Sequence, residues 1–331
     1  MRDAKLMISL GIPALLLVTQ AVAGDSLTVR NAHAMAFNDE RRTIVLFGGA
    51  DAGEVRGDLW EWDGHRWQQV AAEGPPPRTF PAMAYDRARD RLVLFGGNRV
   101  LFGDGGDADT FLSDHWEWSA AGWQQIRKPT PPPRAEAGMV YDEARRRTVL
   151  FGGYRVSGEE RTRLNDTWEW DGEKWIEAAT HGPSPRNGAA LVYDSARRRT
   201  ILFGGNGPSN ETWGWDGRRW QEKPAVSEGL FNSAMAFDEK HGQAIRFGGW
   251  NGEMRVGDTW AFDGENWSRL EASGPPARNH AAMAYDRKRE RLVLFGGHDG
   301  ERVFGDTWEW DGRQWSRPAN FAPRIRIANG H

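Results

Sequence analysis

Few residues in this chain combine a reactive side chain with a neighbour that could hold a charged substrate. Glu136 and His280 each follow an arginine by two positions, Arg134 and Arg278, and His33 follows another arginine closely. A carboxylate or imidazole moves protons in acid/base catalysis, and a guanidinium binds a substrate carboxylate. Glu136, His280, Arg134 and Arg278 are therefore the candidate catalytic residues. The alternatives are ordinary surface polar groups for the first two and, for the arginines, which recur along the chain, a scaffold role between repeat units.

Metal and thiol chemistry have little support. The chain contains no cysteine, which excludes thiol catalysis, cysteine metal sites and disulfides. Asp104, Asp107 and Asp109 offer oxygen ligands for calcium, but their spacing lacks the order and the terminal glutamate of an EF-hand loop. We expect no metal site and no cofactor.

A second set of residues is suited to binding. Trp250 is the one tryptophan outside a repeated pattern, and Tyr154 is the one tyrosine outside a "YD" pair. An aromatic ring that the fold does not require can act as a platform for a sugar or an apolar side chain, or can simply cover neighbouring loops. The candidate ligand-binding residues are Trp250, Tyr154, His298, Asn98, Asn206, Phe231, Asn232 and His33.

The elements that carry these residues come from a repeat. Phe-Gly-Gly ends an apolar run six times, at spacings of 48, 56, 52, 44 and 48 residues. Each unit contains four short segments, as at 81–86, 91–97, 114–118 and 122–126, joined by polar turns such as Asp63-Gly64. The pattern predicts an all-β protein with four antiparallel strands per unit.

Residue size predicts how the sheets are arranged. The first segment of most units carries paired alanines such as Ala82 and Ala84, whereas the last two carry tryptophans such as Trp60, Trp62 and Trp67. Sheets that radiate from an axis lie closest at the innermost strand, so small residues belong inside and bulky ones outside. We predict a six-bladed β-propeller in which seventeen of the eighteen tryptophans fill the gaps between blades. The residues directly after the double glycines are expected to circle the mouth of its central channel.

These residues resemble the kelch family of β-propellers. The resemblance rests on the double glycine after the second strand, the aromatic of the third, the tryptophan of the fourth, and Pro-Arg before each first strand, as at Pro77-Arg78. It covers about residues 29–316 and implies a closed ring of four-stranded blades. It implies no single activity, because the family includes oxidases, sugar epimerases and protein-interaction modules.

The N-terminus is typical of a secretory signal. Basic residues precede an apolar run from Leu6 to Val18 and a small-x-small site ending at Ala23, so we expect residues 1–23 to be cleaved and the protein to be secreted or periplasmic. The alternative is a membrane anchor, for which the run is short. Residues 24–331 then form a single propeller, with blades at about 29–72, 77–128, 133–180, 185–223, 229–272 and 277–317 and a tail at 318–331. The "RIRI" segment at 324–327 is expected to pair with residues 26–29 or to pack across the seam of the ring.

Charge and loop irregularity suggest the function. The net charge of −3 becomes −4 after cleavage, which favours neither nucleic acid nor an anionic membrane as a partner. We expect a monomeric, non-catalytic binding module that holds a carbohydrate or protein at the irregular loop rim. The alternative is a carbohydrate-active enzyme resembling kelch-type sialic acid epimerases and mutarotases. The other rim carries basic turns with interleaved acids, as at 86–91, which predicts a polyanion site or a solvated mixed-charge surface.

Overall fold

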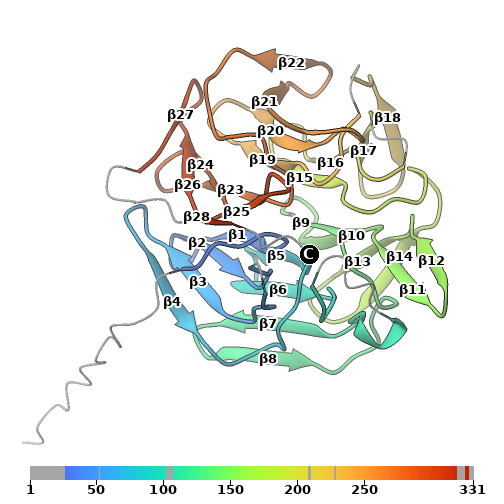
Figure 1. Ribbon diagram of the computed structural model, residues 1–331. Coiled ribbons are helices and arrows are strands. Elements are labelled where there is room, and N and C mark those ends of the chain that lie inside the picture. The colour runs from blue at the N-terminus through green and yellow to red at the C-terminus, as the bar shows by residue number, and fades with distance from the viewer. Residues whose placement is uncertain are drawn as a thin grey trace, which may run out of the picture.

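A computed structural model describes residues 27–51, 53–101, 107–207, 210–226, 229–318 and 325–327. Six four-stranded antiparallel sheets follow one another around a central channel (Figure 1). The predicted fold, an all-β propeller of six blades with four strands each, is confirmed. Within the described residues the one helical element is the 3₁₀ turn η1 (Ala108–Thr110), and no helix there is long and apolar enough to cross a membrane.

Each blade runs outward from its first strand. Blade 1 contains β1 (Ala34–Asn38), β2 (Thr43–Phe47), β3 (Leu59–Trp62) and β4 (Trp67–Ala71); blade 2 contains β5 (Ala82–Asp86), β6 (Arg91–Phe95), β7 (His115–Ser119) and β8 (Gly122–Ile126). Blade 3 contains β9 (Gly138–Asp142), β10 (Arg147–Phe151), β13 (Thr167–Trp170) and β14 (Trp175–Ala179); blade 4 contains β15 (Ala190–Asp194), β16 (Arg199–Phe203), β17 (Thr212–Trp215) and β18 (Trp220–Lys223). Blade 5 contains β19 (Ala234–Asp238), β20 (Gln243–Trp250), β21 (Arg255–Phe262) and β22 (Trp267–Leu270); blade 6 contains β23 (Ala282–Asp286), β24 (Arg291–Phe295), β26 (Thr307–Trp310) and β27 (Trp315–Ser316). Two further pairs, β11 (Tyr154–Ser157) with β12 (Glu160–Arg163) and β25 (Arg302–Phe304) with β28 (Ile325–Ile327), lie outside the blades.

The core lies between blades, as the size gradient predicts. A tryptophan at the start of each fourth strand packs on the phenylalanine that precedes the double glycine in the preceding blade, with ring centroids 4.9–5.6 Å apart in all six interfaces. Five of these indoles also donate a hydrogen bond to that blade, four to a threonine and Trp175 to His115. Buried aromatic area is worth about 25 cal/mol per Å², so these six contacts hold neighbouring blades together.

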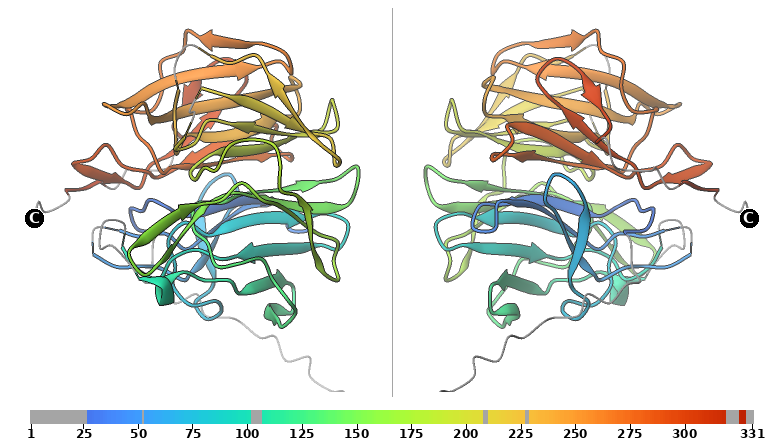
Figure 2. Two further views of the ribbon diagram at one scale, coloured as in Figure 1. Left: turned by 90° about the vertical axis from the view of Figure 1, so that its right-hand side faces the viewer. Right: turned by 90° about the vertical axis from the view of Figure 1, so that its left-hand side faces the viewer.

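The ring closes between blades 1 and 6, which lie side by side in Figure 1. Trp67 packs on Phe295 and donates to Thr307 Oγ1 at 3.0 Å across this seam. Of the two arrangements expected for the tail, pairing with residues 26–29 is wrong, because β28 pairs with β25; β25 itself contacts blade 1 at the seam, where the Phe304 carbonyl accepts a bond from the Arg30 amide. The β25–β28 pair projects from one face of the ring (Figure 2). The predicted signal segment, residues 1–23, lies outside the described residues.

Candidate functional site

A ring of six residues forms the channel mouth on the loop rim. Each residue lies two positions before the first strand of its blade and has left-handed backbone, with φ between 52° and 64°. The amide of each donates to the carbonyl of its counterpart in the preceding blade at 2.7–3.3 Å, and the Ala32 amide closes the circle on the His280 carbonyl. The mouth residues, in ring order, are Ala32, Phe80, Glu136, Gly188, Asn232 and His280. Left-handed backbone normally favours glycine or asparagine, and here the ring of hydrogen bonds compensates for its cost.

Side chains from this ring form two walls. Phe80 and His280 meet above Ala32, with ring centroids 5.0 Å apart. On the opposite side Asn232 and Glu136 lean over Gly188, where a methyl group added to the glycine Cα would lie 2.1 Å from Asn232 Oδ1 and 3.2 Å from Glu136 Oε2. Between the walls is a small pocket of about 140 Å³, which we call the mouth slot; it is lined by these residues and by His33, Pro81, Ala137, Ala189, Ser233 and Ala281.

The carboxyl group of Glu136, in the polar wall, is fixed by a hydrogen bond. Asn187 Nδ2 donates to Glu136 Oε2 at 2.6 Å, and Asn187 is oriented by Arg163, whose Nε donates to its Oδ1 at 3.1 Å. Glu136 is only 8% exposed. Burial raises its pKa, and the bond from Asn187 and the charges of Arg161 and Arg163 offset only part of that effect.

The aromatic wall is uncharged at neutral pH. His280 Nδ1 lies 2.9 Å from His298 Nε2, and the two rings stack at 5.1 Å. Burial lowers the pKa of both, with help from the Arg255 charge; the pKa of His298 falls to about 4 and that of His280 falls well below its ordinary value. His33 is neutral too, because burial and Arg30 lower its pKa to about 3, and its ring lies against Phe295.

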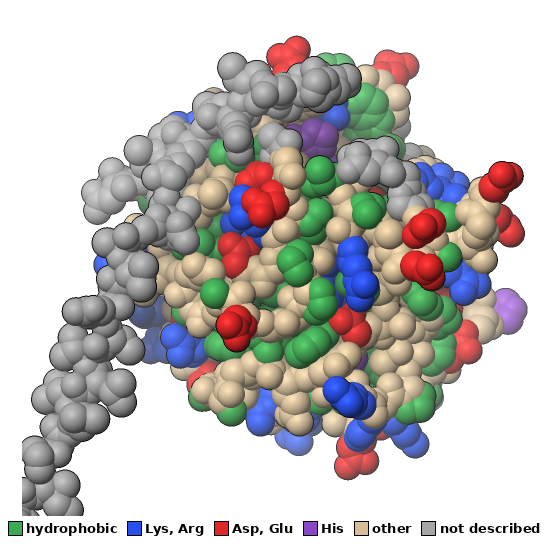
Figure 3. All heavy atoms as spheres, turned by 60° about the horizontal axis from the view of Figure 1, so that its bottom comes forward, with side chains coloured by type: hydrophobic (Ala, Val, Ile, Leu, Met, Phe, Trp, Pro, Cys, Tyr) green, Lys and Arg blue, Asp and Glu red, His purple; other side chains and the backbone are tan. Residues whose placement is uncertain are grey.

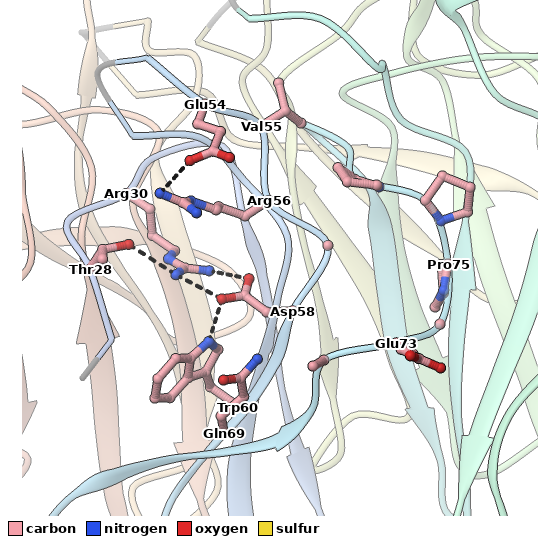
Figure 4. Close-up of a pocket in the computed structure, with 15 residues that line it drawn as sticks. Thr28, Arg30, Glu54, Val55, Arg56, Asp58, Trp60, Gln69, Glu73 and Pro75 are labelled. Atoms are coloured by element: carbon pink, nitrogen blue, oxygen red, sulfur yellow. Dashed lines mark hydrogen bonds and ion pairs between the residues drawn. The ribbon is translucent and has the colours of Figure 1, made fainter. Parts of the chain in front are cut away.

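The arginines that begin five blades are structural. Arg278 is 1% exposed and binds Asp306 at 2.6 and 3.1 Å and the Gly296 carbonyl at 2.9 Å; Arg134 binds Asp166 and the Gly152 carbonyl in the same way. Figure 4 shows this arrangement in blade 1, where Arg30 and Trp60 both bond to Asp58. The guanidinium of each arginine bonds within its own blade, which corrects the expectation that these side chains hold a group of another blade; their backbone groups do bond to the preceding blade. Arg134 and Arg278 are thus committed to the fold.

The residues after the double glycines form a second circle around the mouth. Ala50, Asn98, Tyr154, Asn206, Trp250 and His298 are each bridged to the residue that precedes a mouth residue. They were expected to line the channel mouth itself, but the mouth slot is lined by residues of the first circle.

Side-chain contacts differ around this second circle. Tyr154 is 7% exposed between Phe111 of the blade 2 loop and the Arg161 guanidinium of its own hairpin, so it joins the loops of two neighbouring blades. Trp250 is half-buried at the tip of β20, with the Arg255 guanidinium 4.7 Å from its ring, and it does not line the mouth slot. Asn98 Oδ1 accepts the Val100 amide. Of the eight candidate ligand-binding residues, only Asn232 and His33 line the slot.

A simple sequence signal would have found the mouth ring. Its members lie two positions after Arg30, Arg78, Arg134, Arg186, Leu230 and Arg278. Glu136 and His280 were identified by their chemistry, but Ala32 and Gly188 carry no functional group. Their importance is the space they leave, which only the ring order reveals.

The opposite mouth of the channel is a pocket of about 180 Å³ whose outer residues form ion pairs. Arg87 binds Asp39 at 2.8 Å and also Glu143, while Arg287 binds Glu239 and lies 3.6 Å from Glu143. The basic hairpin turns are neutralised as well, as where Arg89 binds Asp86 and Glu117. The mixed-charge interpretation of this rim fits these pairs, and acidic and basic side chains are also interspersed on the face shown in Figure 3.

Two other cavities are less suited to a site. One, of about 680 Å³, lies among the loops of blade 1 around Arg30, Arg56 and Trp60, where Arg30 pairs with Asp58 and Arg56 with Glu54 (Figure 4). The middle of the channel is lined by alanines and by Met35, Met83, Met139, Leu191, Met235 and Met283, one from each inner strand. No cluster of metal-ligating side chains occurs among the described residues, and Asp104 of the candidate calcium loop lies outside them.

Comparison with known proteins supports the fold type. No protein-family model matches the chain. It is 31% identical over 180 residues to Adagio-like protein 3 of Oryza sativa subsp. japonica, covering 49% of this chain and 27% of that protein. It is 34% identical over 122 residues to dynein regulatory complex subunit 7 of Chlamydomonas reinhardtii and 26% over 184 residues to host cell factor 1 of Homo sapiens, covering 35% and 50% of this chain.

The matched segments are a small part of those proteins, 10% of the dynein regulatory complex subunit and 9% of host cell factor 1. With the six-bladed fold, the similarities support a kelch-type propeller, a fold that suits a binding module. They do not identify a ligand.

Proposed function

We propose that this chain is an exported, non-catalytic binding module that holds a protein or carbohydrate partner at its loop rim. One observation carries the proposal. The six mouth residues have the same backbone role but range from glycine to phenylalanine, so the fold does not dictate their side chains. Side chains that the fold leaves free to vary, gathered around one concavity, are a feature of binding surfaces.

A protein partner has the stronger support. One of the similar proteins is by its name a subunit of a regulatory complex. The mouth slot, at about 140 Å³, is below the roughly 300–1,000 Å³ typical of sites that enclose a whole small molecule. A slot of this size suits one protruding group, with the surrounding rim making the remaining contacts. Export is part of the proposal because of the signal-like residues 1–23.

The enzymatic alternative loses support. It needs an arginine for a substrate carboxylate, and the side chains of Arg134 and Arg278 are buried and bound to Asp166 and Asp306. Glu136 and His280 belong to blades 3 and 6, which lie on opposite sides of the ring.

A binding screen tests the proposal. The full chain, immobilised, is offered to a glycan array and to a random peptide library, and the same screen is run with Trp250→Ala. We expect ligands that the wild type retains and that Trp250→Ala binds at least about tenfold more weakly, because the half-buried Trp250–Arg255 pair lies on the rim. The melting temperature should move by no more than about 4 °C.

Ile176→Ala is the matched control, since Ile176 is exposed on the outer strand β14, away from the rim. If the wild-type protein retains no glycan and no peptide in the screen, the binding role is contradicted. Equal weakening by Ile176→Ala would move the binding surface away from the loop rim.

A further inference from the structure

The charge of the mouth slot indicates what group would enter it. Glu136 is the one acidic or basic residue that lines the slot, apart from histidines, in the part of the chain that the structure describes. The two histidines of its lining, His33 and His280, are neutral at pH 7 because burial lowers their pKa values. Beside Glu136 stands the carboxamide of Asn232, whose oxygen lies over Gly188. The polar wall therefore presents oxygen acceptors.

The nearby cations are engaged elsewhere. Arg163 donates to Asn187, and the Arg161 guanidinium lies 4.7 Å from the Tyr154 ring; both arginines are exposed to solvent. The arginines beneath the mouth, such as Arg134, are paired with carboxylates. An anionic group in the slot would therefore face Glu136 with only the solvent-exposed Arg161 and Arg163 nearby to offset the repulsion, which is unfavourable in a buried setting.

The opposite wall suits an apolar stem. Phe80 and His280 present aromatic surface, and both are less than 10% exposed. A lysine or arginine side chain combines methylene groups with a terminal cation, so its stem would pack on this wall while its head reached the acceptors. A cation–π interaction with these rings would add to the binding where the cation lies over a ring face.

We propose that the mouth slot binds the cationic end of a lysine or arginine side chain presented by a protein partner. The inference rests on the proposed function, because it names the group that the partner inserts. Glu136 and the Asn232 oxygen accept hydrogen bonds from the cation, and Phe80 and His280 enclose its stem. Gly188 and Ala32 supply the space.

Small probes test the slot without any partner. The full chain is titrated with n-butylammonium and n-propylguanidinium, which copy the two side-chain ends, and with n-butanol and butyrate, with binding followed by ligand-observed NMR. We expect one or both cations to bind at least about tenfold more tightly than butanol or butyrate. The stronger of the two identifies the lysine or the arginine version. Equal binding of all four probes, or preference for butyrate, would overturn the inference.

Variants locate the binding. Glu136→Gln should weaken binding of the cation at least about tenfold, whereas Glu54→Gln, at a 66% exposed carboxylate paired with Arg56, should leave it unchanged. Asn232→Gly should weaken it several-fold and suits the backbone, since φ is 56° at that position. If Glu136→Gln fails to fold, Asn232→Gly decides the question. Unchanged binding in the folded variants would refute the slot as the site.

The failures of the two proposals are distinguishable. Cation binding by the slot, with no ligand found in the glycan and peptide screens, would contradict only the wider binding role. A peptide or glycan that depends on Trp250 but binds Glu136→Gln as well as the wild type would contradict only the cation site.

Discussion

Each mouth of the channel is built from one position that repeats in the six blades, but the two mouths differ in what their side chains bond to. At the hairpin end, Asp39, Arg87, Glu143, Glu239 and Arg287 form ion pairs between neighbouring blades and, from Arg287 to Glu143, across the channel, with side chains 24–36% exposed. At the loop end a continuous circle of backbone hydrogen bonds joins the blades, and the side chains of the mouth residues line the slot. A mouth can bind a partner when the backbone alone holds its ring together.

The depth of charge burial also separates the two ends. The loop rim depends on arginines one layer below the mouth, which are at most 1% exposed and bound to carboxylates. Burial alone would raise the pKa of Asp306, but its bonds from Arg278 outweigh burial and hold the pKa below its usual value. The hairpin end has half-exposed pairs instead, and solvent screens such pairs.

The largest effect should come from the buried arginine. Arg278→Ala leaves the Asp306 carboxylate, whose side chain is 3% exposed, without its principal counter-charge. Breaking a buried pair in this way costs about 3–5 kcal/mol in the free energy of unfolding. Urea denaturation checks this value, and a loss below about 1 kcal/mol would mean that the arginine layer does not hold the blades at the loop rim.

A smaller, pH-dependent effect is expected at the slot. Because the pKa of Glu136 is raised in the folded state, the folded protein binds this proton more tightly than the unfolded chain does. Protonated Glu136 therefore favours folding at low pH. That contribution to the free energy of unfolding is lost as the pH rises through the raised pKa. Glu136→Gln removes the proton equilibrium. The stability of Glu136→Gln relative to wild type should therefore increase from about pH 4 to about pH 7.5.

Urea unfolding of both proteins at the two pH values measures this difference. The stabilising contribution of the paired aspartates, such as Asp306, also falls as the pH falls. Both proteins contain these aspartates, so their contribution cancels in the difference between wild type and variant. A difference that is constant with pH, or that reverses, would show that Glu136 is not in the buried environment described.

The smallest effect should come from the hairpin mouth. Arg87→Ala removes the partner of Asp39 and Glu143, but the Arg87 side chain is 36% exposed and Glu143 retains Arg287. We expect a loss below about 1 kcal/mol in the free energy of urea unfolding, reduced further by added salt. A loss comparable with that of Arg278→Ala would remove the contrast between the two ends.

Much of this architecture could be predicted from the repeat. The Phe-Gly-Gly spacing, the alanines of the first strand and the tryptophans of the last two determine strand order and radial direction, because a wedge between diverging sheets can be filled in only one orientation. The pairing of the tail with β25 could not be predicted, since alternation in "RIRI" indicates a strand without naming its partner.

The candidate site was only partly predictable. Glu136 and His280 are visible in the sequence as reactive groups, whereas Trp250 is conspicuous there but lies outside the slot. Arg134 resembled a ligand-binding group until its carboxylate partner, 32 residues away in the chain, was located. A residue's type indicates what it is able to bind, but its actual partner depends on contacts distant in sequence.

The sequence by itself determined the number of blades, the strands within each and the placement of bulk around the axis, because these follow from local periodicity and side-chain volume. Only the tertiary structure decided which residues share the mouth. Closing the ring brings Phe80 to His280 and Glu136 to Asn232 across residues with little or no side chain, and these neighbours are 200 and 96 positions apart. Such proximity is a property of the closed circle of backbone hydrogen bonds, which no single repeat contains.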